Sequence, residues 1–374
     1  MITPNGSTLA IREKNGVKIM KLVAEPVQHE FAPGLSAECW GYNGSTPGPT
    51  IEVTEGDRVR IYVENKLPEA TTVHWHGLPI PNGMDGVGGL TQLSIKPGQT
   101  FRYEFVVERA GTFMYHPHYD EMTQMALGMM GMLVVHPKKP AQKIDRDYAI
   151  MLSEWRVVPG TKRPDPNAMM DFIVVTMNSK VYPATAPLVV QRGERIRIRL
   201  GNLSAMDHHP IHIHGMSFHV VATDGGPVPA SAQKPETTVL VPTGTTRDIE
   251  WIADNNGDWP MHCHMTHHVM TQMGHDVENL VGVDPGNAGA AAHTMVMGPR
   301  GDGDMAEMMM PQPTNTLAMR GTKGPFGTID MGGMFTVIKV RDVVDEHTAA
   351  SDYAHPKDTV AREATAAELA EDVP

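Results

Sequence analysis

The chain has 374 residues, 41% of them hydrophobic, and carries a formal net charge of −12 at pH 7. This length accommodates two or three domains, each with a core of its own. The acidic balance argues against nucleic acid as a partner, and no apolar run is long enough to predict a membrane-spanning helix.

The first 44 residues indicate a strand but show no secretory signal peptide. The first residues, Met1-Ile2-Thr3-Pro4, lack the basic start and apolar core of a secretory signal peptide. Further on, residues 37–44 read as a strand that runs into a turn, and they contain Cys39. Because the only other cysteine, Cys263, is a candidate metal ligand, we expect Cys39 to be a buried thiol outside any structural disulfide.

Two His-x-His pairs follow a predicted strand at residues 55–65, in which apolar side chains recur at every second position. Neighbouring side chains of a strand alternate between faces, so both rings of such a pair would point to one side. Each pair can therefore chelate or bridge metal ions. The pairs are His74/His76 and His116/His118.

The second half of the chain repeats this pattern. Residues 192–202 match residues 55–65 in turn and strand, and a His-x-His-Gly follows each segment. A third pair, His212/His214, stands in this second His-x-His-Gly. Short strands bounded by glycine and proline turns favour two homologous antiparallel β-sandwiches. We place their join near residues 138–140.

The repeat also aligns the third and fourth motifs. The spacing from Gly98 to His116 equals that from Gly244 to His262, so residues 116–118 correspond to residues 262–264. Pro117 stands where Cys263 stands, and proline cannot bind a metal. A thiolate site is therefore predicted in the second domain alone.

Residues 261–273 are the most informative stretch. They hold one cysteine with histidines on both sides, a further histidine at 268, and methionines at 270 and 273. Thiolate, imidazole and a weak axial thioether are the ligands of blue copper sites, which pass single electrons. The histidines beside Cys263 would face the opposite side of the strand and bind further metal there.

Beyond about residue 285 the composition turns to glycine, alanine and methionine, and the chain ends in an acidic tail. Residues 334–340 could add one strand, and the last residues are expected to be mobile or weakly helical. The chain has 28 methionines. Soft thioethers suit Cu(I) as well as core packing, so both roles stay open for the methionine clusters. These clusters are Met122, Met125, Met129, Met130 and Met132, and Met295, Met297, Met305, Met308, Met309, Met310, Met331 and Met334.

The four histidine motifs, in this order, resemble those of the multicopper oxidases, the family of laccases and cuprous oxidases. The resemblance implies an all-β fold of two cupredoxin-type Greek-key β-sandwich domains. These would be residues 1–138, with half of a trinuclear copper cluster, and 139–285, with the type 1 copper and the other half. Residues 286–374 would form a C-terminal extension.

The resemblance also implies a ligand set for about four coppers per chain. His209, Cys263 and His268 match the type 1 ligands, with Met273 axial. Met270 is a rival, but the family places the axial residue five positions after the second equatorial histidine. Type 2 copper would be held by His74 and His212. The type 3 pair would be held by His76, His116, His118, His214, His262 and His264.

Asp85 matches a carboxylate that the family keeps near the type 2 copper, where it helps protons reach the reduced oxygen. A turn-forming role before Gly86 is the alternative. Many relatives have an acidic or aromatic residue just before the second equatorial histidine, and here it is His267. His267 and His208 could titrate near neutral pH or serve as neutral neighbours of the ligands.

A two-domain chain can pair the halves of its cluster by closing a ring, because a heterologous interface that closes gives cyclic symmetry. The resemblance to two-domain laccases implies a homotrimer with clusters at the subunit interfaces.

The expected activity is laccase-like oxidation of phenols or aromatic amines, with dioxygen reduced to water. Oxidation of Cu(I) or another metal ion such as Mn(II) is the alternative, prompted by the methionines. A copper nitrite reductase is disfavoured by Pro117, His262 and His264, and a non-catalytic copper-binding or resistance protein is the remaining reading. The resemblance favours export to the periplasm or beyond, with the cytoplasm as the alternative.

Overall fold

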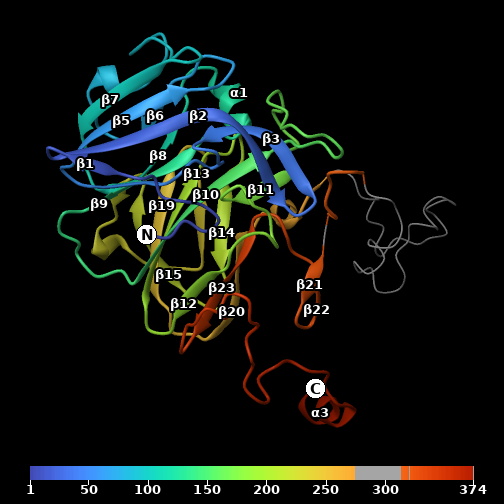
Figure 1. Cartoon of the computed structure of the whole chain (residues 1–374). Coiled ribbons are helices and arrows are strands. Elements are labelled where there is room, and N and C mark those ends of the chain that lie inside the picture. The colour runs from blue at the N-terminus through green and yellow to red at the C-terminus, as the bar shows by residue number, and fades with distance from the viewer. Residues whose placement is uncertain (274–312, 320, 374) are drawn as a thin grey trace.

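The computed structural model describes residues 1–273, 313–319 and 321–373 of the chain. Strands build two β-sandwiches that lie one above the other in Figure 1, the first in blue and cyan and the second in green to red. The prediction of an all-β fold with two sandwich domains is confirmed. The domain boundaries at residues 138 and 285 remain predictions.

The first sandwich consists of two sheets. One has the order β1-β2-β5-β7, with β3 paired to β2, and the other has the order β4-β9-β8-β6. Buried side chains at alternate positions form the core between them. The strands are β1 (Arg12–Lys14), β2 (Val17–Ala32), β3 (Leu35–Tyr42), β4 (Ile51–Thr54), β5 (Arg58–Asn65), β6 (His74–His76), β7 (Thr100–Val106), β8 (Gly111–His116) and β9 (Gly131–His136).

The second sandwich repeats this design. Its sheets have the orders β11-β10-β13-β19-β15-β16, with β17 paired to β15, and β12-β23-β20-β14-β18. The strands are β10 (Arg146–Trp155), β11 (Val174–Met177), β12 (Leu188–Gln191), β13 (Arg195–Asn202), β14 (His209–Ile213), β15 (Phe218–Thr223), β16 (Gly226–Pro227), β17 (Pro235–Glu236), β18 (Thr238–Val241), β19 (Thr246–Ile252), β20 (Gly257–Cys263) and β23 (Phe335–Arg341).

The internal repeat of the sequence corresponds to equivalent strands. β5 lies parallel to β2 and antiparallel to β7, and β13 lies parallel to β10 and antiparallel to β19. In β5 the valine and isoleucine side chains at alternate positions are buried, and β13 buries Ile196, Ile198 and Leu200 in the same way. Period-2 alternation therefore placed both strands correctly.

The strand expected near residues 334–340 forms, but its position differs from an appended strand. β23 lies inside a sheet, parallel to β12 and antiparallel to β20, the strand that ends at Cys263. The second sandwich therefore needs a segment that follows the undescribed residues 274–312. Pairing over a long sequence separation leaves no local signal in the sequence.

The two sandwiches meet along β8 and β9 on one side and β10, β13 and β19 on the other. A hydrophobic cluster spans this boundary, with Met114 and Met132 of the first sandwich and Met151 and Trp155 of the second. Cys39 belongs to it and is a free, buried cysteine, as predicted; burial raises its thiol pKa to about 12.

A buried arginine also joins the sandwiches. Arg199 of β13 is 2% exposed, binds both carboxylate oxygens of Asp147 at 2.8 Å, and donates to Asp248 at 3.1 Å. The same guanidinium donates to Thr112 Oγ1 of the first sandwich at 2.8 Å, and Thr246 donates to the Thr112 carbonyl. These bonds fix one sandwich against the other.

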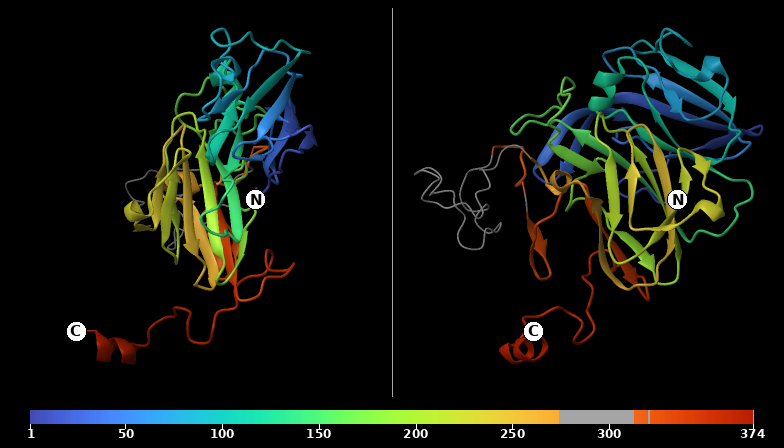
Figure 2. Two further views of the ribbon diagram at one scale, coloured as in Figure 1. Left: turned by 90° about the vertical axis from the view of Figure 1, so that its left-hand side faces the viewer. Right: turned by 180° about the vertical axis from the view of Figure 1, so that it is seen from behind.

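The remaining elements are short: η1 (Asn82–Met84), α1 (Glu121–Ala126), η2 (Ala230–Ala232), η3 (Thr266–Val269), the hairpin β21 (Thr322–Gly324) and β22 (Gly327–Ile329), and α3 (Ala366–Asp372) near the C-terminus. Figure 2 shows α3 set apart from the sandwiches. Within the described ranges no helix is long and apolar enough to cross a membrane.

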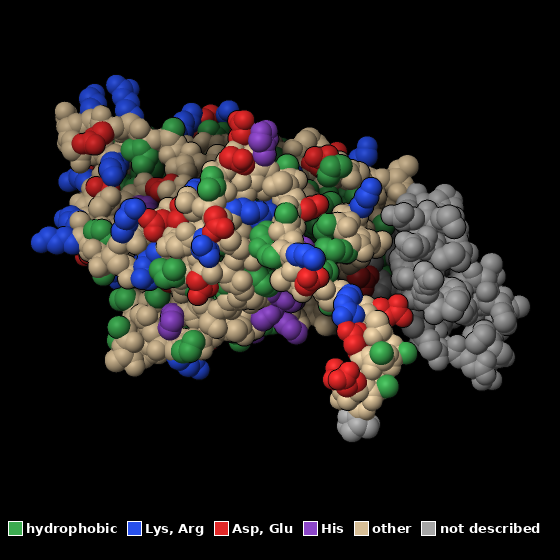
Figure 3. All heavy atoms as spheres, turned by 90° about the horizontal axis from the view of Figure 1, so that it is seen from below, with side chains coloured by type: hydrophobic (Ala, Val, Ile, Leu, Met, Phe, Trp, Pro, Cys, Tyr) green, Lys and Arg blue, Asp and Glu red, His purple; other side chains and the backbone are tan. Residues whose placement is uncertain are grey.

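Acidic and basic side chains are interspersed on the face drawn in Figure 3, which fits a net charge spread along the chain. Of the methionine clusters, Met129, Met130, Met132 and Met334 are buried and pack in cores, while Met122 is 62% exposed. Residues 295–310 lie outside the described part of the chain, so the prediction of a soft-metal role there stays open.

Candidate metal centres

A cysteine and two histidines meet at one end of the second sandwich. Cys263 Sγ lies 3.7 Å from His209 Nδ1 and 3.4 Å from His268 Nδ1, and the two Nδ1 atoms are 3.2 Å apart. Strands β14 and β20 carry His209 and Cys263, and η3, directly after β20, carries His268. All three residues are buried, so their donor atoms form a compact set shielded from solvent.

Polar neighbours orient both imidazoles. His209 Nε2 lies 2.6 Å from Ser204 Oγ, and His268 Nε2 lies 3.3 Å from the carboxylate of Asp207. Each contact engages the outer nitrogen and leaves Nδ1 facing the sulfur. Fixing one ring nitrogen so that the other faces the metal is how proteins prepare histidine ligands.

Burial sets the protonation of this group in the metal-free chain. Burial lowers the pKa of His209 to about 3, with a further contribution from His268, and it raises the pKa of the Cys263 thiol to about 12. The imidazoles are therefore neutral and ready to bind, whereas a metal must displace the thiol proton. One thiolate and two imidazoles suit copper, so the residues present fit a type 1 centre.

The two candidate axial methionines lie in different surroundings. Met273 packs against the hydrophobic cluster that contains Cys263, and its backbone N–H donates to Ile173 O at 2.9 Å. The rival Met270 caps η3, and its carbonyl lies against Gly333. The choice of Met273 over Met270 as the axial ligand stays a prediction.

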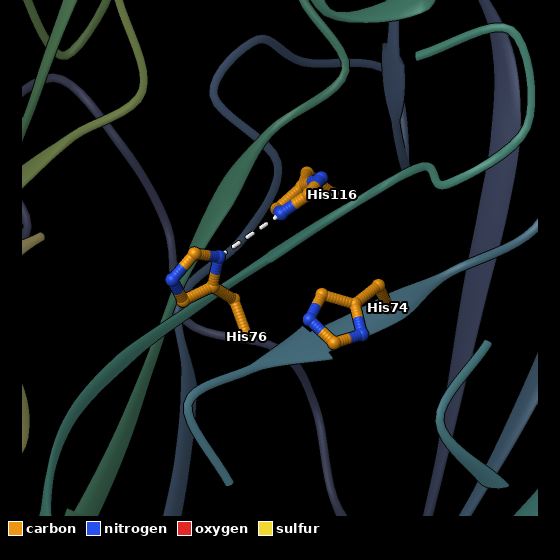
Figure 4. A group of neighbouring side chains, drawn as sticks. All are labelled: His74, His76 and His116. Atoms are coloured by element: carbon orange, nitrogen blue, oxygen red, sulfur yellow. Dashed lines mark hydrogen bonds between the residues drawn. The ribbon is translucent and has the colours of Figure 1, made fainter. Parts of the chain in front are cut away.

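The four histidines of the first sandwich form a second group. β6 pairs with β8 so that His74 stands opposite His116, and cross-strand neighbours of this kind hold their side chains together. The His74 ring lies 5.4 to 5.7 Å from the rings of His76, His116 and His118. Figure 4 shows His74, His76 and His116 converging, with His76 Nδ1 3.2 Å from His116 Nε2.

Backbone carbonyls orient these rings. His74 Nδ1 donates to Asp85 O at 2.7 Å, and His116 Nδ1 donates to Pro117 O at 2.9 Å, so neither carbonyl occupies an Nε2 atom. Burial lowers the pKa of His116 to about 3 and also lowers the pKa of His76. His76 and His116 are thus neutral imidazoles near pH 7.

The second sandwich presents an equivalent group of four. His212 of β14 stands opposite His262 of β20, and the His212 ring lies 4.7 to 5.7 Å from those of His214, His262 and His264. His212 Nδ1 donates to Thr237 O at 2.8 Å, and His262 Nδ1 donates to Cys263 O at 2.8 Å. His214 Nε2 and His262 Nε2 are 3.0 Å apart.

Adjacent residues of β20 join this group to the cysteine site. The Cys263 side chain faces His209 and His268, while the His262 side chain on the other face of the strand meets His212 and His214. The two centres are therefore linked through one backbone.

The two groups of four histidines remain separate within one chain. Over the described residues, the ring contacts join histidines inside each group and none joins a histidine of the first group to one of the second. Each group of four histidines, called a half-set below, therefore makes no ring contact with the other group in the same chain.

A cavity of about 540 Å³ opens onto the first group of histidines. Its wall includes Glu121 and Met125 of α1, and Glu154, Leu203 and Ser204 of the second sandwich. Ser204 lines this cavity and also contacts His209 Nε2. One residue therefore lies between the cavity and the cysteine site.

Sequence reasoning identified the candidate ligands but missed their partners. Glu121 lies 3.4 Å from His116 Nδ1 and 3.7 Å from His118 Nε2; its position three residues after His118 was an available signal. Glu154 accepts hydrogen bonds from the backbone N–H groups of Met206 and Asp207, and burial together with Asp207 raises its pKa to about 8. Nothing in the sequence marks Glu154, Ser204 or Asp207, because tertiary contacts alone bring them here.

The remaining predicted residues lie as follows. The Asp85 carboxylate is 3.4 Å from His74 Nδ1 and partly exposed, so it stands at the edge of the first group. His208 Nδ1 accepts a hydrogen bond from the Thr243 backbone N–H at 3.1 Å, and His267 is an exposed residue of η3. Neither His208 nor His267 belongs to a ligand group.

Comparison with known proteins agrees with this geometry. Two family models described as multicopper oxidase match residues 24–140 and 158–282. The blue copper oxidase of Nitrosomonas europaea is a structural neighbour with TM-score 0.64 and 29% identity, and the match covers 86% of this chain and 85% of that one.

Curated relatives match over a shorter part of their length. Copper resistance protein A of Pseudomonas syringae pv. tomato is 30% identical over 49% of this chain and 38% of its own. Laccase-1 of Cryptococcus neoformans var. grubii is 32% identical over 55% of this chain and 37% of its own. The chain thus matches about two fifths of these relatives.

Proposed function

This chain belongs to the multicopper oxidase family, and we propose that it is a laccase-like oxidase. Its donors would be phenols or aromatic amines that give up one electron at a time near His268, with dioxygen reduced to water at the histidine cluster. The observation that carries this proposal is the shared strand β20. It places Cys263 in a thiolate–imidazole site and His262 in a histidine cluster on the opposite face.

Bound copper would supply the one-electron chemistry and the activation of dioxygen. His209, Cys263 and His268 would hold the type 1 ion, with Met273 as a further ligand, and the eight other histidines would hold a type 2 ion and a type 3 pair. Burial lowers the pKa of His209 and keeps its imidazole neutral, while Ser204 orients the His209 ring and a backbone carbonyl orients the His74 ring.

Asp85 is proposed to handle protons at the cluster. Its carboxylate is partly exposed and lies beside His74, so it can exchange protons with solvent and pass them toward the cluster. Apolar side chains such as Met125 and Leu203 form part of the cavity along the first group, and they would limit the amount of water on that side of the cluster.

We further propose a homotrimer in which the first sandwich of one copy faces the second sandwich of the next. The separation of the two histidine groups within a chain supports this arrangement, because each group then gains its counterpart from a neighbour. A ring closed by identical heterologous contacts gives every copy one complete cluster. We also propose export from the cytoplasm, to be tested by cell fractionation.

A second candidate function is oxidation of Cu(I) or another metal ion. Met206 and Met265 are 58% and 40% exposed and lie in the segments that carry Asp207 and His268. Soft thioethers beside a carboxylate suit a soft cation. The similarity to copper resistance protein A is in keeping with this alternative. A copper-binding protein without turnover is the non-enzymatic alternative.

The test is an absorption spectrum with a copper count, followed by oxygen uptake. We expect intense blue colour, a near-ultraviolet shoulder and about four coppers per chain. Faster uptake with a phenolic dye than with Cu(I) supports the laccase-like proposal, and the reverse order supports the metal-ion oxidase. Copper-loaded protein that consumes oxygen with neither donor would refute both and leave a storage role.

A further inference from the structure

The loop of residues 86–95 exposes two leucines beside the first histidine group. Leu90 is 83% exposed and Leu93 is 81% exposed, the highest values among the large hydrophobic side chains of the described ranges. A single exposed leucine is ordinary, but two of them on one short loop form an apolar projection that water does not favour. We call this segment the Leu90–Leu93 loop.

Hydrogen bonds within the loop hold the leucines in place. The Val87 carbonyl accepts from the backbone N–H groups of Leu90, Thr91 and Gln92, and the Val87 N–H donates to Thr91 Oγ1. At the start of the loop Gly86 has a φ of +86°, and a Cβ there would stand 1.8 Å from Val73 O. The loop is therefore a tightly folded platform that presents its leucines in a defined position.

Hydrogen bonds connect the loop and its N-terminal neighbour Asp85 to two candidate copper ligands. Gly88 N–H donates to the carbonyl of His118, and Asp85, just before the loop, accepts from His74 Nδ1. A molecule that packs on this side of the histidine group would therefore meet the Leu90–Leu93 loop. A displacement of the loop would also disturb the orientation of His74.

A matching apolar side chain lies beside the second histidine group. Leu240 of β18 is 50% exposed, and β18 is the edge strand that pairs with β14, which carries His209 and His212. Each group of four histidines thus has at least one exposed leucine side chain near it. Two such surfaces that face each other would exclude water when the half-sets meet.

We propose that the Leu90–Leu93 loop is a docking element for a second copy of this chain, packing on the second sandwich of that copy beside its histidine group. The inference rests on the ring arrangement proposed above and specifies which surface makes it. Burial of both leucines would stabilise the ring, and the same contact would hold Asp85 and His74 in place for the shared cluster.

The test compares Leu90→Ser/Leu93→Ser with the control Phe326→Ser. Phe326 is 72% exposed in the turn between β21 and β22, away from β6 (Figure 1). For the double variant we expect the dissociation constant of the trimer, measured by sedimentation equilibrium, to rise on the order of 100-fold or more. Its blue colour should stay, because Cys263 lies outside the contact, while the near-ultraviolet shoulder and copper content fall.

The outcomes separate this inference from the proposed function. If the wild-type chain and the double variant both form trimers of equal strength, the loop does not dock and only this inference fails. A wild-type monomer that holds full copper and consumes oxygen would overturn the ring itself, and the inference with it. Retained blue colour shows that the variant is folded.

A labelling experiment checks the same contact without weakening it. Both native cysteines are buried, so a maleimide should react mainly with an introduced thiol. In the trimer, Leu90→Cys should react at least about tenfold more slowly than Phe326→Cys, because burial denies the reagent access. Equal rates in the trimer would show that the loop is exposed and would overturn the proposal.

Discussion

The buried arginine between the sandwiches gives the sharpest stability prediction. Arg199→Met keeps most of the side-chain volume but removes the guanidinium that binds Asp147, Asp248 and Thr112. Asp248 is 4% exposed and would then lose its cationic partner. Removing one partner of a buried ion pair costs about 3–5 kcal/mol, because the remaining charge stays desolvated. The unfolding equilibrium constant should therefore rise roughly 140- to 4,000-fold.

The pH dependence of this cost gives a second, independent check. Burial raises the pKa of Asp248, and Arg199 opposes that rise. Without the arginine the folded-state pKa of Asp248 should climb further above its unfolded value. A carboxyl of this kind penalises folding at pH values above its folded-state pKa, and the penalty disappears as pH falls through that value. The stability deficit of Arg199→Met should therefore shrink as the pH falls toward the lower pKa that Asp248 has in the unfolded chain.

The assay is urea unfolding of the metal-free chain, with Arg199→Met compared with the wild type at each pH. Contributions of the histidines are shared by both proteins and cancel in the difference. The double variant Arg199→Met/Asp248→Leu should recover part of the loss, since it removes the stranded charge. A deficit below about 1 kcal/mol at pH 7, or one that grows on acidification, would refute the reasoning.

Three further predictions concern the metal centres. Cu(II) binding at the Cys263 site at pH 7 should release about one proton, because the metal-free thiol is protonated. Calorimetry in two buffers measures the number of protons released, and Cys263→Ser should release none at that site. Ser204→Ala removes the partner of His209 Nε2 and should weaken type 1 copper affinity about 10- to 100-fold, measured by chelator competition, with blue colour retained at saturation. Burial lowers the pKa values of His116 and His209 to about 3, so the unfolded chain binds more protons than the folded chain below about pH 6.5. The metal-free protein should therefore lose stability as the pH falls from about 6.5 toward about 3. Urea midpoints that stay unchanged over this range would contradict the prediction.

The sequence alone determined the candidate ligands and the fold class. Strand alternation predicted that both rings of each His-x-His pair share a face and that Cys263 and His262 point to opposite faces, and the structure places them so. The internal repeat predicted two sandwiches and a thiolate site in the second alone. These inferences succeeded because they depend on local periodicity and residue chemistry.

Tertiary structure decided what local periodicity cannot encode. Ser204, Asp207 and Glu154 reach the cysteine site only because the turn after β13 folds against β10 and β14. Strand β23 enters the sheet beside β20 from far along the chain, and the two histidine groups lie apart because the sandwiches are fixed against each other. Long-range pairing and packing follow from the surfaces that fit in three dimensions, whereas the donor atoms follow from residue types and their spacing.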